Sequence, residues 1–156
     1  SEMHPHLIVT RTFSKAHGLA SLRTGYAISS PPLAAVLERT RLTFNVNLYA
    51  QVAATLAMAD SAHVERVRAA NASERAWLSA QLRALGLFVF PSQGNFVLVD
   101  FERPAKPIED AMLKRGVILR PMGGYGLPTC LRITVGLRDE NEALLAALRI
   151  VLAERA

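Results

Sequence analysis

One long helical pattern in the middle of the chain sets the limits on its architecture. The pattern runs from about Ala62 to Leu85. Asp60 or Ser61 can cap its start through a side-chain oxygen, and Gly86 follows its last turn, where a left-handed backbone is common. A helix of this length often connects two domains. We therefore expect two organisational units, one on each side of it.

The region before this helix has the pattern of the edge of a larger α/β domain. An apolar run predicts a strand over Leu7 to Thr12, and a second strand over Gly25 to Ser29 stops at Pro31-Pro32. Apolar residues at helical spacing then predict helices over Leu33 to Arg41 and over Leu48 to Met58.

The region after the long helix is richer in strands and predicts a small α+β layer. Two helices are expected, over Pro107 to Arg115 and over Asp139 to Glu154, and glycine ends the first of them. Short apolar runs predict four strands, at Leu87 to Phe90, Asn95 to Phe101, Val117 to Arg120 and Leu131 to Val135.

Composition indicates a globular protein of the cytoplasm. The chain has 156 residues, of which 51% are hydrophobic, enough to bury a core. No apolar stretch approaches the roughly 18 residues that would span a bilayer, and no signal-peptide pattern is present at the start. Cys130 is the only cysteine, so an internal disulfide is excluded.

The net charge of +5 does not by itself indicate nucleic-acid binding. The basic residues are spread along the chain among acidic ones, without a basic run beside aromatic residues. Four of them fall on the long helix and are expected on its exposed face: Arg66, Arg68, Arg75 and Arg83. The four histidines lack metal-ligand spacing, so we expect no metal site and neither a nucleic-acid nor a membrane partner.

Lys15 carries the first candidate site. It follows the first predicted strand, and strand ends are where α/β folds build sites. An amine can form a Schiff base only when it is deprotonated, which a dry, positively charged pocket favours. Ser14 and Arg23 lie close by in sequence and could hold a phosphate. Alternatively, Lys15 and Arg23 are solvated surface charges and Ser14 an ordinary loop hydroxyl.

Arg132 carries the second candidate site. It interrupts the apolar strand Leu131-Arg-Ile-Thr-Val135, where a charge is costly unless it meets an anion. Arg120, at the end of the preceding predicted strand, could act with it or could cap strand carbonyls instead.

Residues 10–27 read T-R-T-F-S-K-A-H-G-L-A-S-L-R-T-G-Y-A. This string resembles the cofactor-lysine segment of the class I/II pyridoxal-phosphate aminotransferases, most closely the histidinol-phosphate aminotransferases. The resemblance covers nearly the whole chain, because four further segments occur in the family's order and spacing: Phe44 to Asn47, Pro91 to Leu98, Arg115 to Arg120, and Cys130 to Gly136. His17, Ser21 and Leu48-Tyr49 depart from the family's usual residues.

The resemblance implies a fold of the α/β class, namely the C-terminal part of an aspartate aminotransferase-like fold. Residues 1–60 would end the large cofactor-binding domain, 61–86 would form a linking helix, and 87–156 would form the small α+β domain. The family's remaining cofactor contacts, including the aspartate on the pyridine nitrogen, lie upstream of the lysine. We therefore expect a C-terminal portion that is inactive alone and that pairs with a second copy or with the preceding part of the enzyme.

The resemblance also implies a role for each candidate residue. Lys15 would hold pyridoxal 5'-phosphate covalently and move a proton at the substrate's α-carbon, while Ser14 and Arg23 would hold the cofactor phosphate. Arg132 would bind a substrate carboxylate or the equivalent polar end of an amino alcohol phosphate, and Arg120 the distal phosphate of the substrate.

The implied reaction is transamination between histidinol phosphate and 2-oxoglutarate in histidine biosynthesis, by a homodimeric enzyme. An aromatic aminotransferase or a relative of the phosphothreonine decarboxylases shares these motifs and stays open as an alternative. A non-catalytic α/β interaction module, in which the lysine is structural, is the alternative from another class.

Overall fold

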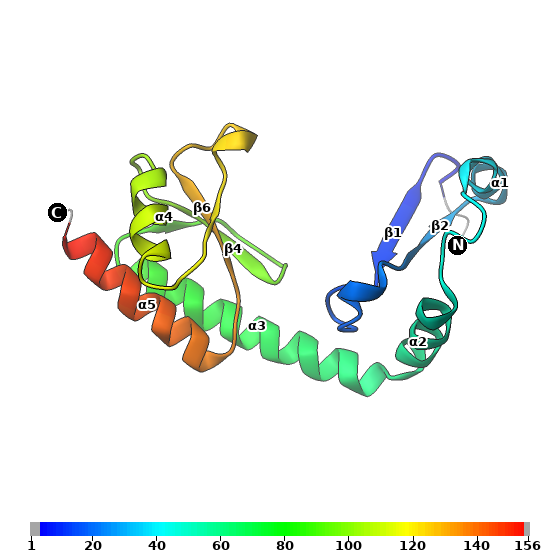
Figure 1. Ribbon diagram of the computed structural model, residues 1–156, viewed down its shortest axis with the longest axis horizontal. Helices are drawn as coiled ribbons and strands as arrows, with labels where there is room; N and C mark the ends of the chain where they lie inside the picture. The colour runs from blue at the N-terminus through cyan, green and yellow to red at the C-terminus, as the bar shows by residue number, and fades with distance from the viewer. Residues whose placement is uncertain (1–3, 155–156) are drawn as a thin grey trace. The chain divides into compact units, whose positions relative to one another are not determined.

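The structure is a computed structural model, which describes residues 4–154 of the chain. It divides into two compact units, one running to Arg68 and the other starting at Ala69 (Figure 1). The boundary falls inside the long helix. The assignment of 1–60, 61–86 and 87–156 as domains of a larger enzyme stays a prediction.

The first unit contains a two-stranded antiparallel sheet and two helices. Strand β1 (Ile8–Thr12) pairs with β2 (Gly25–Ser29) over all five residues of each strand, and the 3₁₀ turn η1 (Ala20–Leu22) lies in the loop between them. Pro31 and Pro32 begin helix α1 (Pro31–Thr40), as expected from their fixed φ. Helix α2 (Leu48–Ala59) starts at Asn47, whose side chain accepts a hydrogen bond from the Ala50 amide at 2.9 Å.

Helix α3 (Ser61–Ala84) is the predicted long helix. The Oδ1 of Asp60 accepts a hydrogen bond from the His63 amide at 2.9 Å, so Asp60 rather than Ser61 caps its start. Gly86 follows its end with φ of 80°, the left-handed conformation that only glycine adopts at little cost.

The second unit is a four-stranded antiparallel sheet with the order β3-β4-β6-β5. Its strands are β3 (Phe88–Val89), β4 (Phe96–Asp100), β5 (Arg120–Pro121) and β6 (Cys130–Thr134). Its other elements are helix α4 (Lys106–Leu113), the 3₁₀ turn η2 (Gly123–Tyr125) and helix α5 (Arg138–Ala153).

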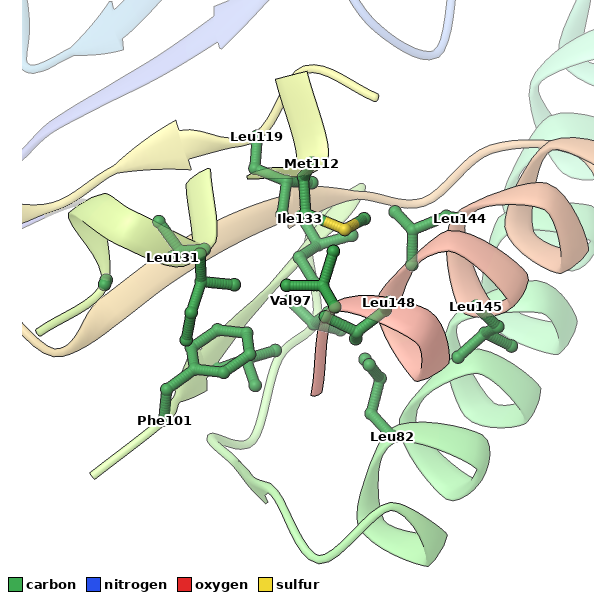
Figure 2. Close-up of a cluster of buried hydrophobic side chains, with 14 of the residues drawn as sticks. Leu82, Val97, Phe101, Met112, Leu119, Leu131, Ile133, Leu144, Leu145 and Leu148 are labelled. Atoms are coloured by element: carbon green, nitrogen blue, oxygen red, sulfur yellow. The ribbon is translucent and has the colours of Figure 1, made fainter. Parts of the chain in front are cut away.

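One hydrophobic core holds this second unit together (Figure 2). Alternate residues of the two central strands point into it, and they meet apolar side chains from α3, α4 and α5. Core residues that are almost completely buried include Leu82, Val97, Met112, Leu131, Ile133, Leu145 and Leu148. The helices therefore cover one face of the sheet, and the intervening strand residues, Arg132 among them, lie on the other face.

The predicted strand over Val117 to Arg120 is wrong. Its first residue is held by the turn that follows α4, because the Val117 amide donates to the Met112 carbonyl at 3.0 Å. Ile118 is 83% exposed and has no neighbouring strand. Only Arg120 and Pro121 pair with β6, so Arg120 begins the strand rather than ending it.

The expectation that the arginines of α3 form a solvated face is wrong for Arg75, whereas Arg83 is exposed as predicted but also bonds the backbone. Arg75 is half-buried and donates to the Gly94 carbonyl at 3.0 Å, and Arg83 donates to the Val89 carbonyl at 3.3 Å. Both side chains thereby attach α3 to the backbone around β3 and β4.

We predict that Leu148→Ala destabilises the second unit by about 2 to 5 kcal/mol, because the substitution leaves a cavity where the side chain is fully buried. Urea unfolding followed by circular dichroism measures the change. Ile150→Ala, at a position of the same helix that is 51% exposed, is the control and should change the stability by less than about 0.5 kcal/mol. Equal effects of the two substitutions would contradict the position of the core.

Candidate functional site

A closed loop between β1 and β2 carries the three candidate residues of the first unit. Phe13 is buried, and its ring centroid lies 4.9 Å from that of His17 and 5.7 Å from that of Tyr26. The Phe13 amide donates to the Thr24 carbonyl at 3.2 Å, and the Phe13 carbonyl accepts from the Leu19 amide at 2.9 Å. These contacts fix the base of the loop.

The Phe13–Thr24 hydrogen bond places Ser14 and Arg23 next to each other at this base, since each is the neighbour of a bonded residue. Arg23 has a φ of 52°, which is uncommon for a residue other than glycine and is found at sites where the backbone is held in place. Its Nη1 donates to the Ala20 carbonyl at 2.9 Å, which leaves its other donors available.

Lys15 lies on the same loop and is exposed. Its carbonyl accepts a hydrogen bond from the Gly18 amide at 2.9 Å, which closes a turn directly after the lysine. Within residues 4–154, no side chain forms an ion pair with its amine. The dry pocket expected around Lys15 is not formed by this part of the chain. His17, two residues on, has its Nδ1 buried without a hydrogen-bond partner.

Arg132 lies in the second unit, on the face of the sheet opposite the helices. It stands at the centre of β6, across from Leu98 of β4. Its guanidinium lies over the ring of Phe96, with the Cζ atom 5.1 Å from the ring centroid. Its Nε is buried and has no hydrogen-bond partner in the described part of the chain, so a donor on this face is left for an acceptor from outside.

Arg120 stands directly across the sheet from Arg132, because the two residues are paired in the β5–β6 register. Residues paired in this way project from the same face of a sheet, and like charges in this arrangement repel each other. Neither guanidinium has a carboxylate partner among the described residues. The arrangement can bind an anion that bridges the two.

A polar cluster at the end of the sheet holds the backbone of this face in place. Glu74 of α3 accepts three hydrogen bonds from Arg138, at 2.9 to 3.2 Å, and one from the side chain of Asn141 at 3.0 Å. Asn141 is buried and also bonds both the amide and the carbonyl of Gly136, each at 3.0 Å. Gly136 follows β6 closely, so α3 fixes the end of the strand that carries Arg132.

The other side of this cluster holds the start of β4. Asn71 and Arg75 of α3 both donate to the Gly94 carbonyl, at 3.2 and 3.0 Å. The Val135 amide donates to the Asn95 carbonyl at 2.9 Å, so Asn95 contributes through its backbone. The sequence analysis did not predict this cluster or the contact of the Phe96 ring with Arg132. The alternation of β4, which places Phe96 on the face away from the core, is a signal that could have indicated the contact.

The structure thus gathers the candidate residues into two groups in different units, Ser14, Lys15 and Arg23 in the first, and Arg120 and Arg132 in the second. Within the described residues, no three His, Cys, Asp or Glu side chains gather as metal ligands. Over the same range no helix is both long enough and apolar enough to cross a membrane.

Comparison with known proteins defines the class. The sequence model of the family described as aminotransferase class I and II matches residues 1–148, and the chain belongs to this family. The "Histidinol-phosphate aminotransferase" of Anaeromyxobacter sp. (strain Fw109-5) is 52% identical over 150 residues, which cover 96% of this chain and 41% of that relative. The "Histidinol-phosphate aminotransferase 2" of Pseudomonas aeruginosa shows the same identity and coverage. The chain therefore spans about 41% of the length of these relatives.

Solved structures agree with the sequence comparison. The histidinol-phosphate aminotransferase from Sinorhizobium meliloti, solved in complex with pyridoxal-5'-phosphate, matches with a TM-score of 0.89 and 34% identity over 97% of this chain and 42% of that one. An aspartate aminotransferase from Thermotoga maritima matches with a TM-score of 0.84 at 20% identity, which supports the fold alone. The predicted aspartate aminotransferase-like fold is confirmed.

We predict that the cluster around Glu74 makes stability depend on pH. Hydrogen bonds from Arg138 and then Asn141 lower the pKa of Glu74 below 4.5, its usual value, against the opposing effect of partial burial. The stabilisation is therefore complete above pH 4.5 and is lost as the pH falls through the lowered pKa.

Glu74→Gln should be less stable than the unsubstituted chain at neutral pH, and the difference should shrink on acidification below pH 4.5. Urea unfolding at a series of pH values measures both effects. Glu154→Gln, which removes the exposed ion pair with Arg115, is the control for loss of a carboxylate in the same unit. A difference between Glu74→Gln and the unsubstituted chain that stays constant with pH would contradict the prediction.

Proposed function

We propose that the chain is the C-terminal part of a pyridoxal-phosphate-dependent aminotransferase that transfers an amino group between histidinol phosphate and 2-oxoglutarate. The observation that carries this proposal is the pair of guanidiniums on one sheet face, for which residues 4–154 provide no carboxylate partner. The phosphate of one substrate and the carboxylates of the other are both anions that such a pair can bind. The 52% identity to two histidinol-phosphate aminotransferases supports the choice of substrate.

The donors of the loop between β1 and β2 fit pyridoxal phosphate chemically. Lys15 offers an exposed amine that can hold the aldehyde. Ser14 and Arg23, side by side at the base of the loop, offer a hydroxyl and a guanidinium suited to a phosphate. When bound, the cofactor draws electrons away from the substrate's α-carbon.

The residues of the chain then act by binding, orienting and moving a proton. The Nζ of Lys15, in its neutral form, can accept the proton from the substrate's α-carbon and return it later. Arg132 and Arg120 hold the anionic ends of the substrate and thereby orient it. Asn141 bonds the backbone of Gly136, just after β6, and its side-chain amide also donates to Glu74; these hydrogen bonds keep Arg132 in a fixed position.

We also propose that the enzyme is a cytoplasmic homodimer and that the first unit needs partners. A two-stranded sheet is marginally stable by itself. Apolar side chains of this unit are exposed, to 95% at Phe44 and 80% at Tyr49. A second copy and the preceding part of the enzyme are the partners expected to cover them. The alternative of an interaction module predicts no role for the amine of Lys15.

We predict that Lys15→Ala lowers the activity of the complete enzyme by at least about 100-fold, since proton transfer by one side chain contributes about that much. Transamination of histidinol phosphate measures the loss. Borohydride reduction followed by digestion should place the pyridoxyl label on Lys15. Lys114→Ala, at an exposed lysine outside the site, is the control and should keep full activity. A label on another lysine, or activity with phenylalanine alone, would contradict the proposed function.

We predict that the chain by itself associates through its first unit. Size-exclusion chromatography with light scattering should give a mass above the 17.0 kDa of one chain. Phe44→Ser should shift the distribution towards the monomer, because it removes a large exposed apolar surface. A monomer that unfolds in a single cooperative transition across both units would show that the first unit needs no partner.

A further inference from the structure

Tyr125 contacts Arg120, one of the two paired arginines, and has no role so far. The Nη2 of Arg120 donates a hydrogen bond to the Oη of Tyr125 at 3.2 Å. The same guanidinium lies 6.0 Å from the centroid of the tyrosine ring. The phenol is 66% exposed, so it fixes Arg120 while staying open to a ligand.

The turn after β5 brings Tyr125 back to Arg120. The Tyr125 and Leu127 amides both donate to the Met122 carbonyl, at 2.9 and 3.2 Å. Gly126 has a φ of 78°, which reverses the chain directly after the tyrosine. The Met122 amide donates in turn to the Cys130 carbonyl at 3.2 Å, so the turn is anchored to β6, the strand of Arg132.

The direction of the hydrogen bond determines what the hydroxyl can do next. A guanidinium only donates, so the tyrosine oxygen accepts from Arg120 and its own proton stays available. Within the described residues no acceptor takes that proton. The face therefore offers two guanidiniums and one hydroxyl donor, and its donors outnumber the acceptor oxygens of a single carboxylate.

We infer that Tyr125 is a specificity-determining residue that selects a phosphorylated amino donor over a carboxylated one at this face. The inference rests on the proposed function. A phosphate monoester presents three acceptor oxygens and up to two negative charges, which match both arginines and the tyrosine hydroxyl. A carboxylate presents two oxygens in one plane and a single charge, so it offers the same three groups fewer acceptor positions and less charge than a phosphate.

Tyr125→Phe tests the inference, because it keeps the ring beside Arg120 and removes only the hydroxyl. In the complete enzyme we expect kcat/KM for histidinol phosphate to fall about tenfold, the effect of one hydrogen bond to a charged group, while kcat/KM for phenylalanine changes less than about twofold. Arg120→Lys should lower the value for histidinol phosphate further, since lysine cannot hold the same paired geometry. Arg149→Lys, on the exposed side of α5, should leave both values unchanged.

A binding measurement on the chain itself separates this inference from the proposed function. In NMR spectra, the Nε–H signals of Arg120 and Arg132 are identified as those that disappear in Arg120→Lys and Arg132→Lys. Inorganic phosphate should shift these signals, and Tyr125→Phe should weaken the binding of phosphate about tenfold. If phosphate binding depends on Tyr125 but the complete enzyme does not turn over histidinol phosphate, the inferred phosphate selectivity stands and the proposed substrate is wrong. If the enzyme turns over histidinol phosphate and Tyr125→Phe leaves the ratio of kcat/KM for histidinol phosphate to kcat/KM for phenylalanine unchanged, the inference is overturned.

Discussion

The pairing of β4 with β6 is the interaction on which the second unit depends. Five residue pairs connect the strands, from Phe96 with Thr134 to Asp100 with Cys130. A shift of the register by one residue would move Arg132 to the face covered by helices and move Leu131 and Ile133 into solvent. The hydrophobic core and the anion-binding face therefore require the same register, and neither can change without the other. Asn71 and Arg75 of α3 bond Gly94, just before β4, and Asn141 of α5 bonds Gly136, just after β6. These hydrogen bonds hold in place the end of the pairing at which Phe96 meets Thr134.

The second unit tolerates an electrostatic cost on its open face. Arg120 and Arg132 are cross-strand neighbours of like charge. The ring of Phe96 lies against Arg132, and the ring and hydroxyl of Tyr125 contact Arg120, while no carboxylate of the described residues pairs with either arginine. An acidic partner would stabilise the fold but would compete with an anionic substrate. Because the rings orient the guanidiniums without neutralising them, the face keeps its charge for the ligand. Partial burial of Arg132 strengthens this effect, since its Nε has no partner within the described residues.

Local patterns in the sequence predicted most of the helices and strands. The features that were predicted wrongly or missed depend on contacts between residues far apart in the chain. The strand Gly25–Ser29 was predicted, and the helix cap was narrowed to Asp60 or Ser61, because apolar periodicity and capping are local properties. The strand over Val117 to Arg120 was wrong because its apolar residues have no neighbouring strand, which sequence does not reveal. The cluster around Glu74 was missed because its partners lie 64 and 67 residues away along the chain. The structure shows the local geometry of the candidate site residues, but their roles stay predictions. These residues are Lys15, Ser14, Arg23, Arg120 and Arg132.

The two units differ in how far their sites depend on other surfaces. In the second unit a closed core and hydrogen bonds from α3 and α5 fix the strands, so the face with Arg120 and Arg132 is held by residues of this chain alone. In the first unit the loop of Lys15 is anchored by Phe13, but the sheet beneath it has only two strands and the lysine is exposed. Removal of water from around an amine favours its neutral, reactive form. We therefore expect recognition of the substrate's anion to be a property of the second unit by itself, whereas the chemistry of Lys15 requires surfaces that enclose it.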